Sequence, residues 1–313
     1  MAQKESAMAH CSNCPRVCGV DRAAQAGFCG APWNVSVAAV CLHRGEEPPL
    51  SGEKGIVNIF FSHCNMRCVY CQNRVVSRSE PQVVQRYGTL EEVVDRVEQL
   101  LPQSENMVGL VSPSHYVYVV PELVERIRQR GLSPTVVYNT GGYDSVEALR
   151  MVAPYVDVYL PDYKYISPEL ARRYSATPDY VEVAQRALEE MVYQKGTSLP
   201  TDDRGMAYRG VIVRHLVLPG QAAHSVGCLQ WIADNLSTRV HVSLMAQYYP
   251  PEELVGTLPD ELNRTLLPSE YGQVTTAFEE LGFTRGWVQE LEASASYRPD
   301  FASSSVFEEQ QRN

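Results

Sequence analysis

The chain has 313 residues, a formal net charge of −10 and 44% hydrophobic residues. This composition is that of an ordinary globular protein and excludes long disorder, collagen-like repeats and extended coiled coil. The acidic balance argues against a general nucleic-acid binder, and no apolar run approaches the roughly 18 residues of a membrane span. The start of the sequence shows no apolar signal segment, so we expect a cytoplasmic protein without nucleic-acid or membrane partners.

The nine cysteines are the most informative feature of the composition. In a reducing cytosol, cysteines serve as metal ligands or catalytic groups more often than as disulfides. Seven of them form two groups along the chain, namely Cys11, Cys14, Cys18 and Cys29, followed by Cys64, Cys68 and Cys71. The two lone cysteines, Cys41 and Cys228, are expected to be small buried residues.

The first 50 residues predict a small module and a connector. The cysteine-rich start is too small to bury much apolar surface, so a bound metal is the natural stabiliser. Residues 42–55 contain two prolines and three glycines and predict a connecting loop.

From Ile56 onward, strand and helix patterns alternate. The expected strands are Ile56–Phe61, Met107–Val111, Thr135–Asn139, Val156–Leu160, Val211–Val217 and Val240–Met245. The expected helices begin at the capping box of Thr89 and Glu92, at Pro121, at a cap formed by Asp144 with Glu147, at Thr177-Pro178, and at Ala222.

This alternation predicts a parallel sheet, either doubly wound or a partial barrel, with the functional residues at the carboxyl ends of the strands. Residues 195–209 predict a long loop that would suit a lid over the site. The polar tail from Ala293 is expected to be disordered or loosely docked.

The motif with the clearest chemistry is Cys64-Asn-Met-Arg-Cys68-Val-Tyr-Cys71, directly after the first expected strand. Three thiolates at this spacing hold three irons of a [4Fe–4S] cluster and leave the fourth iron open. The same spacing would also place three core cysteines on one face of a helix. The polar neighbours Asn65 and Arg67 favour the cluster.

The motif resembles the radical S-adenosylmethionine (SAM) superfamily and, more narrowly, the C-N-x-R-C-x-[FY]-C-x-N run of pyruvate formate-lyase activating enzymes. The segments CSNCPRVCGV, GEEPPLSGEKG, VYNTGGYDS, YLPDYKY, HLVLPG and LMAQYYP resemble an uncharacterised branch of these activases. The resemblance implies an α/β fold, a partial (β/α)6 TIM-like barrel at residues 51–290. A cysteine-rich N-terminal module precedes it at residues 1–50, and a polar C-terminal tail follows at residues 291–313.

The resemblance implies an oxidoreductase that cleaves SAM reductively to a 5′-deoxyadenosyl radical for hydrogen abstraction. Its narrowest form is activation of a glycyl radical enzyme. The alternatives are radical modification of a peptide or small metabolite, and a non-catalytic iron–sulfur or zinc protein that transfers electrons. An electron donor of the flavodoxin or ferredoxin type is the implied partner, together with a protein substrate in the activase case.

The resemblance also implies a set of cofactor-binding residues. Tyr70 takes the place of the aromatic beside adenine, and Ser112 and His115 take the place of the Gly-Gly-Glu stretch that contacts the methionine amine. His115 would replace a glutamate there. The other implied SAM-binding residues are Asn139, Thr140, Gly141, Asp162, Lys164, Arg214 and His215, with Gln247 and Tyr248 as rim candidates.

The N-terminal group Cys11, Cys14, Cys18 and Cys29 supplies four soft ligands. Four thiolates suit either tetrahedral Zn²⁺ or a second iron–sulfur cluster. The sequence leaves this choice open, and it does not identify the substrate.

Overall fold

The computed structural model describes residues 10–80, 83–295, 299–303 and 306–307. The first nine residues of the expected N-terminal module therefore lie outside the described residues. The same holds for parts of the expected tail at 296–298, 304–305 and 308–313.

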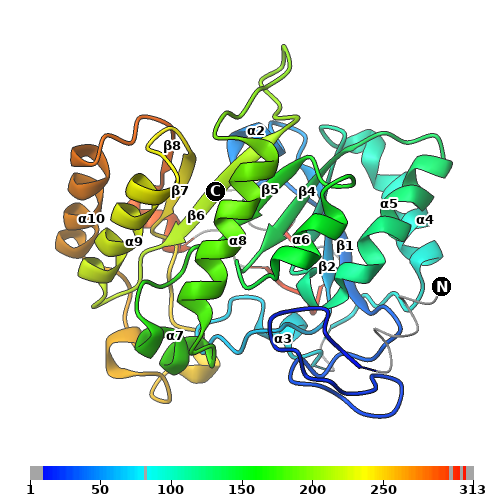
Figure 1. Ribbon diagram of the computed structural model, residues 1–313, viewed down its shortest axis with the longest axis horizontal. Helices are drawn as coiled ribbons and strands as arrows, with labels where there is room; N and C mark the ends of the chain where they lie inside the picture. Colours follow the sequence, from blue (N-terminus) through cyan, green and yellow to red (C-terminus); the bar gives the residue numbers. More distant parts are fainter. Residues whose placement is uncertain (1–9, 81–82, 296–298, 304–305, 308–313) are drawn as a thin grey trace.

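Eight strands form one open sheet in chain order (Figure 1). They are β1 (Val37–His43), β2 (Ile56–Phe61), β3 (Met107–Val111), β4 (Thr135–Thr140), β5 (Val158–Pro161), β6 (Gly210–Leu216), β7 (His241–Met245) and β8 (Gly286–Val288). Strand β1 is antiparallel to β2, and every other neighbouring pair is parallel. The expected partial barrel is confirmed, with β1 and β8 as its edges.

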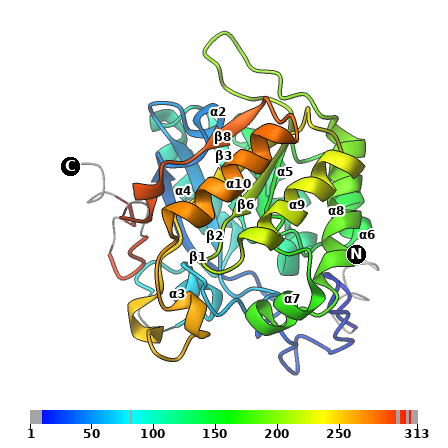
Figure 2. The ribbon, with the colours of Figure 1, turned by 90° about the vertical axis from the view of Figure 1, so that its left-hand side faces the viewer.

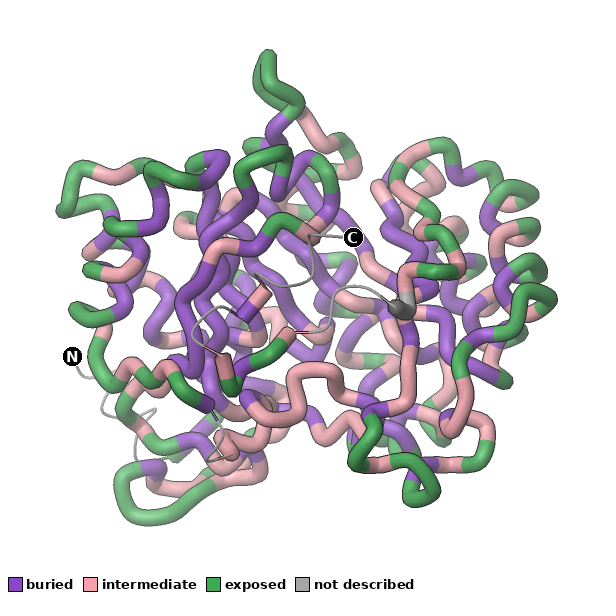
Figure 3. The backbone as a smooth tube through the Cα atoms, turned by 180° about the vertical axis from the view of Figure 1, so that it is seen from behind, coloured by how far each residue is buried: buried purple, intermediate pink, exposed green. Residues whose placement is uncertain are grey.

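The longer helices cover the outside of this sheet, and the short ones lie at its two ends (Figures 1 and 2). Their bounds are α2 (Pro48–Ser51), α3 (Arg74–Ser77), α4 (Leu90–Leu100), α5 (Val120–Gln129), α6 (Val146–Val152), α7 (Pro168–Ser175), α8 (Tyr180–Lys195), α9 (Ala222–Asn235) and α10 (Pro268–Glu280). Short 3-10 turns lie at Leu101–Gln103, Ser114–Val119, Glu252–Leu254, Asp260–Leu262 and Leu291–Ala295. In Figure 3 the central strands are buried, whereas the outer turns of the helices are largely exposed.

The two edge strands were not predicted from the sequence. Strand β1 is buried along almost its whole length, but it contains two alanines, which are weak strand formers. It reaches into the predicted loop of residues 42–55, which also contains α2. Strand β8 has three residues, too few for a periodic signal. Helices α3, α7 and α10 were also missed.

The sequence predicted N-terminal caps for α4 and α6, and the structure confirms only the first. The predicted capping box at α4 is confirmed, because Thr89 Oγ1 accepts from the Glu92 N–H and the Glu92 carboxylate accepts from the Thr89 N–H. The predicted Asp144 cap is wrong. Ser145 caps α6 through the Ala148 N–H, while Asp144 is buried and accepts hydrogen bonds from Tyr138 and Thr140.

The loop at 195–209 does not cover the site. It enters β6 at the amino end of that strand (at the top of Figure 1), opposite the carboxyl ends. Met206 and Ala207 pack with Leu50 and the amino-end core of the sheet, and the Ala207 N–H bonds the Pro49 carbonyl at 2.9 Å. The loop therefore closes the far end of the barrel, and the lid prediction is wrong.

The described part of the C-terminal tail is docked. Phe301 and Val306 are buried in a cluster with Phe60 of β2 and residues of β1, and the ring centroids of Phe60 and Phe301 are 5.1 Å apart. The polar character of the tail concealed these apolar anchors. In the described part of the chain, no helix is both long and apolar enough to cross a membrane.

Candidate functional site

The three cysteines of the central motif line one cavity of about 440 Å³. The segment from Ser62 to Cys71 follows β2 as a turn and bend rather than a helix, which removes the alternative of three core cysteines on a helical face. His63, just before Cys64, has a positive φ of 70°, and this left-handed residue turns the chain out of the strand.

Each of the three sulfurs has a polar neighbour. The Met66 N–H lies 3.4 Å from Cys64 Sγ, the Ser175 hydroxyl 3.0 Å from Cys68 Sγ and the Ser77 hydroxyl 3.6 Å from Cys71 Sγ. Burial raises the pKa of Cys64 to about 12, although the Met66 N–H and Lys164 oppose this. Because buried thiols resist ionisation, a bound metal is what would hold them as thiolates, and the donors around them fit an iron–sulfur cluster.

Tyr70 is buried beside this loop and also lines the cavity. Its hydroxyl lies 2.5 Å from the Tyr165 hydroxyl, which lies 2.7 Å from the Ser175 hydroxyl. Ser175 in turn donates to Cys68. A chain of hydroxyl groups therefore fixes the aromatic ring relative to the cysteine loop.

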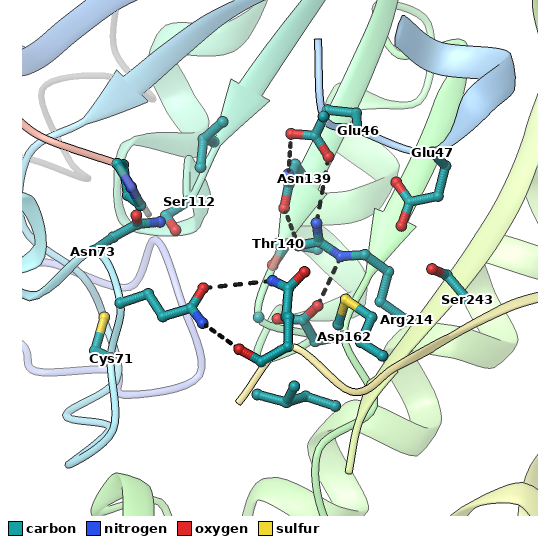
Figure 4. A pocket seen from close by; sticks show the side chains of 18 of the residues that line it. Glu46, Glu47, Cys71, Asn73, Ser112, Asn139, Thr140, Asp162, Arg214 and Ser243 are labelled. Carbon is teal, nitrogen blue, oxygen red and sulfur yellow. Dashed lines mark hydrogen bonds and ion pairs between the residues drawn. The ribbon is translucent and has the colours of Figure 1, made fainter. Parts of the chain in front are cut away.

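Opposite the cysteines lies a network of partly buried charges from the carboxyl ends of β5 and β6 (Figure 4). Asp162 and Arg214 are bridged through their backbones. Asp162 bonds Arg214 at 2.9 Å and Lys164 at 2.5 Å. Burial alone would raise the pKa of Asp162, but the two cations hold it below its usual value.

Strand β4 contributes a polar strip to the same cavity. Asn139 accepts from Arg214 at 2.6 Å, and Thr140 and Gly141 follow it along the wall. A Cβ on Gly141 would lie 3.0 Å from Met66 Sδ and 3.6 Å from Lys164 Cε, so glycine keeps this part of the cavity open. Ser112, at the end of β3, lines the same space.

Two predicted residues lie outside the cavity lining. His115 is buried with its Nε2 2.8 Å from the Ser62 carbonyl, so its predicted contact with the SAM amine does not fit its position. His215 lies on the opposite face of β6 from Arg214 and bonds the Tyr163 carbonyl at 2.7 Å, because successive strand residues face opposite sides. Burial lowers the pKa of His115 to about 3 and that of His215 to about 4.

Of the two rim candidates, only Gln247 lines the cavity. Gln247 lines the cavity and exchanges hydrogen bonds with Gln72, next to Cys71. Tyr248 is buried, and its hydroxyl bonds the Leu262 carbonyl at 2.6 Å, so it supports the wall from behind.

Sequence analysis missed two acidic residues of the cavity, Glu46 and Glu47, which follow β1. Glu46 accepts from Asn58 at 2.9 Å and pairs with Arg214 at 3.5 Å. Glu47 is buried, and its Oε2 has no hydrogen-bond partner. Burial raises the pKa of Glu47, with Arg214 opposing the shift and Glu46 adding to it. The only signal was the pair of adjacent acids in the segment GEEPP.

The open side of the sheet is also part of the cavity wall. The lining includes His43 of β1, Trp287 of β8, and Pro299 and Phe307 of the tail. The rings of His43 and Phe307 have centroids 3.9 Å apart. The tail therefore lies where the cavity meets both edge strands.

The N-terminal cysteines lie against the back of the cysteine loop. Arg16 bonds the Asn65 carbonyl at 3.0 Å, and Arg67 bonds the Phe28 carbonyl at 2.7 Å. The thiols of Cys11, Cys14, Cys18 and Cys29 are unpaired by disulfides. Within the described residues, no group of three or more His, Cys, Asp or Glu side chains is arranged around a single metal ion.

Comparison with known proteins identifies a domain in this chain. The model of the radical SAM superfamily matches residues 58–197, a range that contains the cysteine motif and the polar ends of β3, β4 and β5. The chain therefore contains a radical SAM domain over these residues. Members of this superfamily are enzymes that bind a [4Fe–4S] cluster and SAM and require an electron donor.

The chain is 28% identical over 279 residues to the uncharacterized protein MJ0674 of Methanocaldococcus jannaschii, covering 86% of this chain and 73% of that protein. Among solved structures it is similar to a domain of pyruvate-formate lyase-activating enzyme from Bacteroides vulgatus. That match has a TM-score of 0.39 and 12% identity, over 56% of this chain and 92% of that domain. The hydrogenase maturase HydG matches with a TM-score of 0.46 and 14% identity, over 73% of this chain and 50% of HydG.

Proposed function

We propose that the protein cleaves SAM reductively at Cys64, Cys68 and Cys71 and directs the resulting radical to a substrate in the cavity. The observation that carries this proposal is that all three thiols share one cavity with the partly buried charge network of Asp162, Lys164 and Arg214. Such a cavity provides both a cluster site and charged groups for a zwitterionic cofactor.

When bound, the cluster and SAM supply the electron and the 5′-deoxyadenosyl group that abstracts hydrogen. Lys164 would neutralise the SAM carboxylate, because it lines the same cavity as the cysteines. Its pairing with Asp162 keeps the pKa of Lys164 raised against the effect of burial. Gly141 and Asn139 would let the cofactor lie close to the backbone of β4. Tyr70, fixed by its hydroxyl chain, would pack beside the adenine.

The test is anaerobic reconstitution with iron and sulfide, followed by SAM and dithionite. We expect release of 5′-deoxyadenosine with methionine, and loss of both products in Cys68→Ala. Cys228→Ala is the matched control, since Cys228 is buried in α9 away from the cavity. Absence of SAM binding by the reconstituted protein would instead favour a non-catalytic iron–sulfur or zinc protein.

The substrate is the finer part of the proposal. Resemblance to the activating enzymes favours the glycine loop of a glycyl radical enzyme. The tail favours the alternative, a small metabolite, because Pro299 and Phe307 line the cavity and take up space that a protein loop would need. We therefore propose a small substrate that carries a hydrogen-bond donor, such as an amine, for the unpartnered Glu47 oxygen.

The two substrate classes can be separated with fractions of an extract of the source organism. A small-molecule ultrafiltrate is expected to stimulate release of 5′-deoxyadenosine, and Glu47→Gln is expected to lose this stimulation. Stimulation by the protein fraction alone would support the activase function and overturn the small-substrate proposal. A flavodoxin or ferredoxin is the proposed physiological donor.

A further inference from the structure

The N-terminal cysteine module is in direct contact with the loop that holds the radical SAM motif. The Asn65 Oδ1 lies 3.9 Å from Cys64 Sγ, and the Asn65 side chain opposes the rise that burial causes in the pKa of the Cys14 thiol. One amide thus lies beside a thiol from each cysteine group. The same amide donates to the Tyr143 carbonyl at 2.8 Å, which fixes it between the two groups.

Other contacts hold the two loops together. Arg16 bonds the Asn65 and Ala176 carbonyls and stacks on the Phe28 ring at 3.6 Å. The His63 ring lies beside Gly30, which directly follows Cys29, because a Cβ on Gly30 would lie 3.5 Å from His63 Nδ1. The interface is therefore built by residues adjacent to the ligands on both sides.

Each sulfur of the N-terminal group has an N–H neighbour. Phe28 N–H donates to Cys18 Sγ at 3.4 Å and Ala31 N–H to Cys29 Sγ at 3.4 Å. The Asn13 amide lies 3.8 Å from Cys11 Sγ, and the Arg16 backbone N–H opposes the rise that burial causes in the pKa of Cys14. Donors to sulfur stabilise thiolate ligands and set the reduction potential of an iron–sulfur centre.

The location of the module suits electron entry. The cysteines of the motif face a cavity whose open side is covered by the tail, whereas the module forms an outer layer with exposed residues around 23–26 (bottom of Figure 1). A protein donor can therefore dock on the module more directly than on the inner cysteines.

We infer that Cys11, Cys14, Cys18 and Cys29 hold a second iron–sulfur cluster that passes electrons past Asn65 to the cluster at Cys64, Cys68 and Cys71. One electron from a flavodoxin- or ferredoxin-type donor reduces the outer cluster. That cluster returns to its oxidised form when it reduces the inner one by the same electron, and no proton or bond changes at this step. The function of this relay rests on the proposed SAM cleavage, whereas the presence of the second cluster is independent of that proposal.

The first test is iron and zinc content with EPR of the anaerobically purified wild-type chain. Two cubanes require about eight irons per chain, and we expect that value with no zinc. About four irons with one zinc would overturn the inference. Cys68→Ala removes an inner ligand and should still show the EPR signal of the outer cluster, so this readout survives even if SAM cleavage fails.

The second test uses the double variant Cys11→Ala/Cys14→Ala. We expect loss of about half of the iron, retention of the dithionite-reduced inner EPR signal, and loss of inner-cluster reduction by reduced flavodoxin. Cys228→Ala is expected to behave as wild type. Reduction of the inner cluster by flavodoxin at the wild-type rate in the double variant would overturn the relay. If the double variant does not fold, Asn65→Leu is used instead, with both clusters present. The rate at which reduced flavodoxin reduces the inner cluster is expected to fall below that of wild type, and an unchanged rate would overturn the relay.

Discussion

Asp162 holds two cations at the centre of the site, and Asp162→Asn is the sharpest test of that electrostatic arrangement. The carboxylate bonds Lys164 Nζ at 2.5 Å and Arg214 Nε at 2.9 Å. The side chains of all three residues are 16–17% exposed. An asparagine keeps the shape and one acceptor oxygen but removes the negative charge, which leaves two nearly buried cations without their shared anion.

The magnitude follows from the geometry. At an effective dielectric constant of about 20, each ion pair is worth about 6 kcal/mol of direct attraction, before desolvation is subtracted. Breaking a buried pair by removing one partner typically costs about 3–5 kcal/mol in the free energy of unfolding. We expect Asp162→Asn to fall in this range. Because Asp162 keeps a depressed pKa, its contribution is fully present above its ordinary pKa of 3.8 and is lost as the pH falls through its lower folded-state value.

The assay is urea unfolding of the apo protein, followed by circular dichroism at about pH 7 and about pH 5. The matched control is Asp95→Asn, which also removes an Asp–Arg pair, with Arg130 at 2.8 Å, but at a side chain 52% exposed. We expect this surface change to cost at most about 1 kcal/mol. The reasoning is refuted if both variants unfold at the same urea concentration, or if the Asp162→Asn effect disappears already at pH 5.

Three further predictions follow from other buried groups. Because the pKa of Glu47 is raised by burial, Glu47→Gln should be more stable than wild type at neutral pH, with an advantage that shrinks as the pH falls toward 4.5; an advantage that grows on acidification would contradict this. Burial holds the pKa of His115 at about 3, so this one residue should lower the free energy of unfolding by about 2 kcal/mol at pH 5 relative to pH 7, and His115→Gln should reduce the total pH-dependent loss by that amount while His215 keeps its own share. Tyr165→Phe breaks the hydroxyl chain between Tyr70 and Ser175 and should cost about 1–3 kcal/mol in thermal or urea unfolding, whereas an unchanged midpoint would show that Tyr70 is held by packing alone.

Most of the barrel could be predicted because its strands are short apolar runs bounded by strong turn and cap signals. Strand β3 was predicted at its observed bounds, and α4 through its capping box. The edge strand β1 was missed because it contains two alanines, which are weak strand formers, and runs directly into the proline- and glycine-rich segment 42–55. The Asp144 cap failed for another reason: Ser145 is an equally good cap, and only the folded core shows that Asp144 serves Tyr138 and Thr140 instead.

The site likewise contains residues that the sequence predicted and contacts that only the fold determines. Local spacing was enough to propose the cysteine motif, because its three ligands lie within eight residues and need no distant partner. The sequence also identified Asp162, Lys164 and Arg214 as candidates, but their shared ion pairs depend on the parallel pairing of β5 with β6.

Long-range packing decided the rest. Which face of a strand points into the barrel separates Arg214 from His215, and the covering of the open side by residues near Phe301 brings the tail to the cavity. The position of Asn65 beside both cysteine groups likewise joins segments about fifty residues apart. Sequence determines chemistry carried by neighbouring residues, whereas contacts across the chain arise only when burial of apolar surface fixes the relative positions of distant elements.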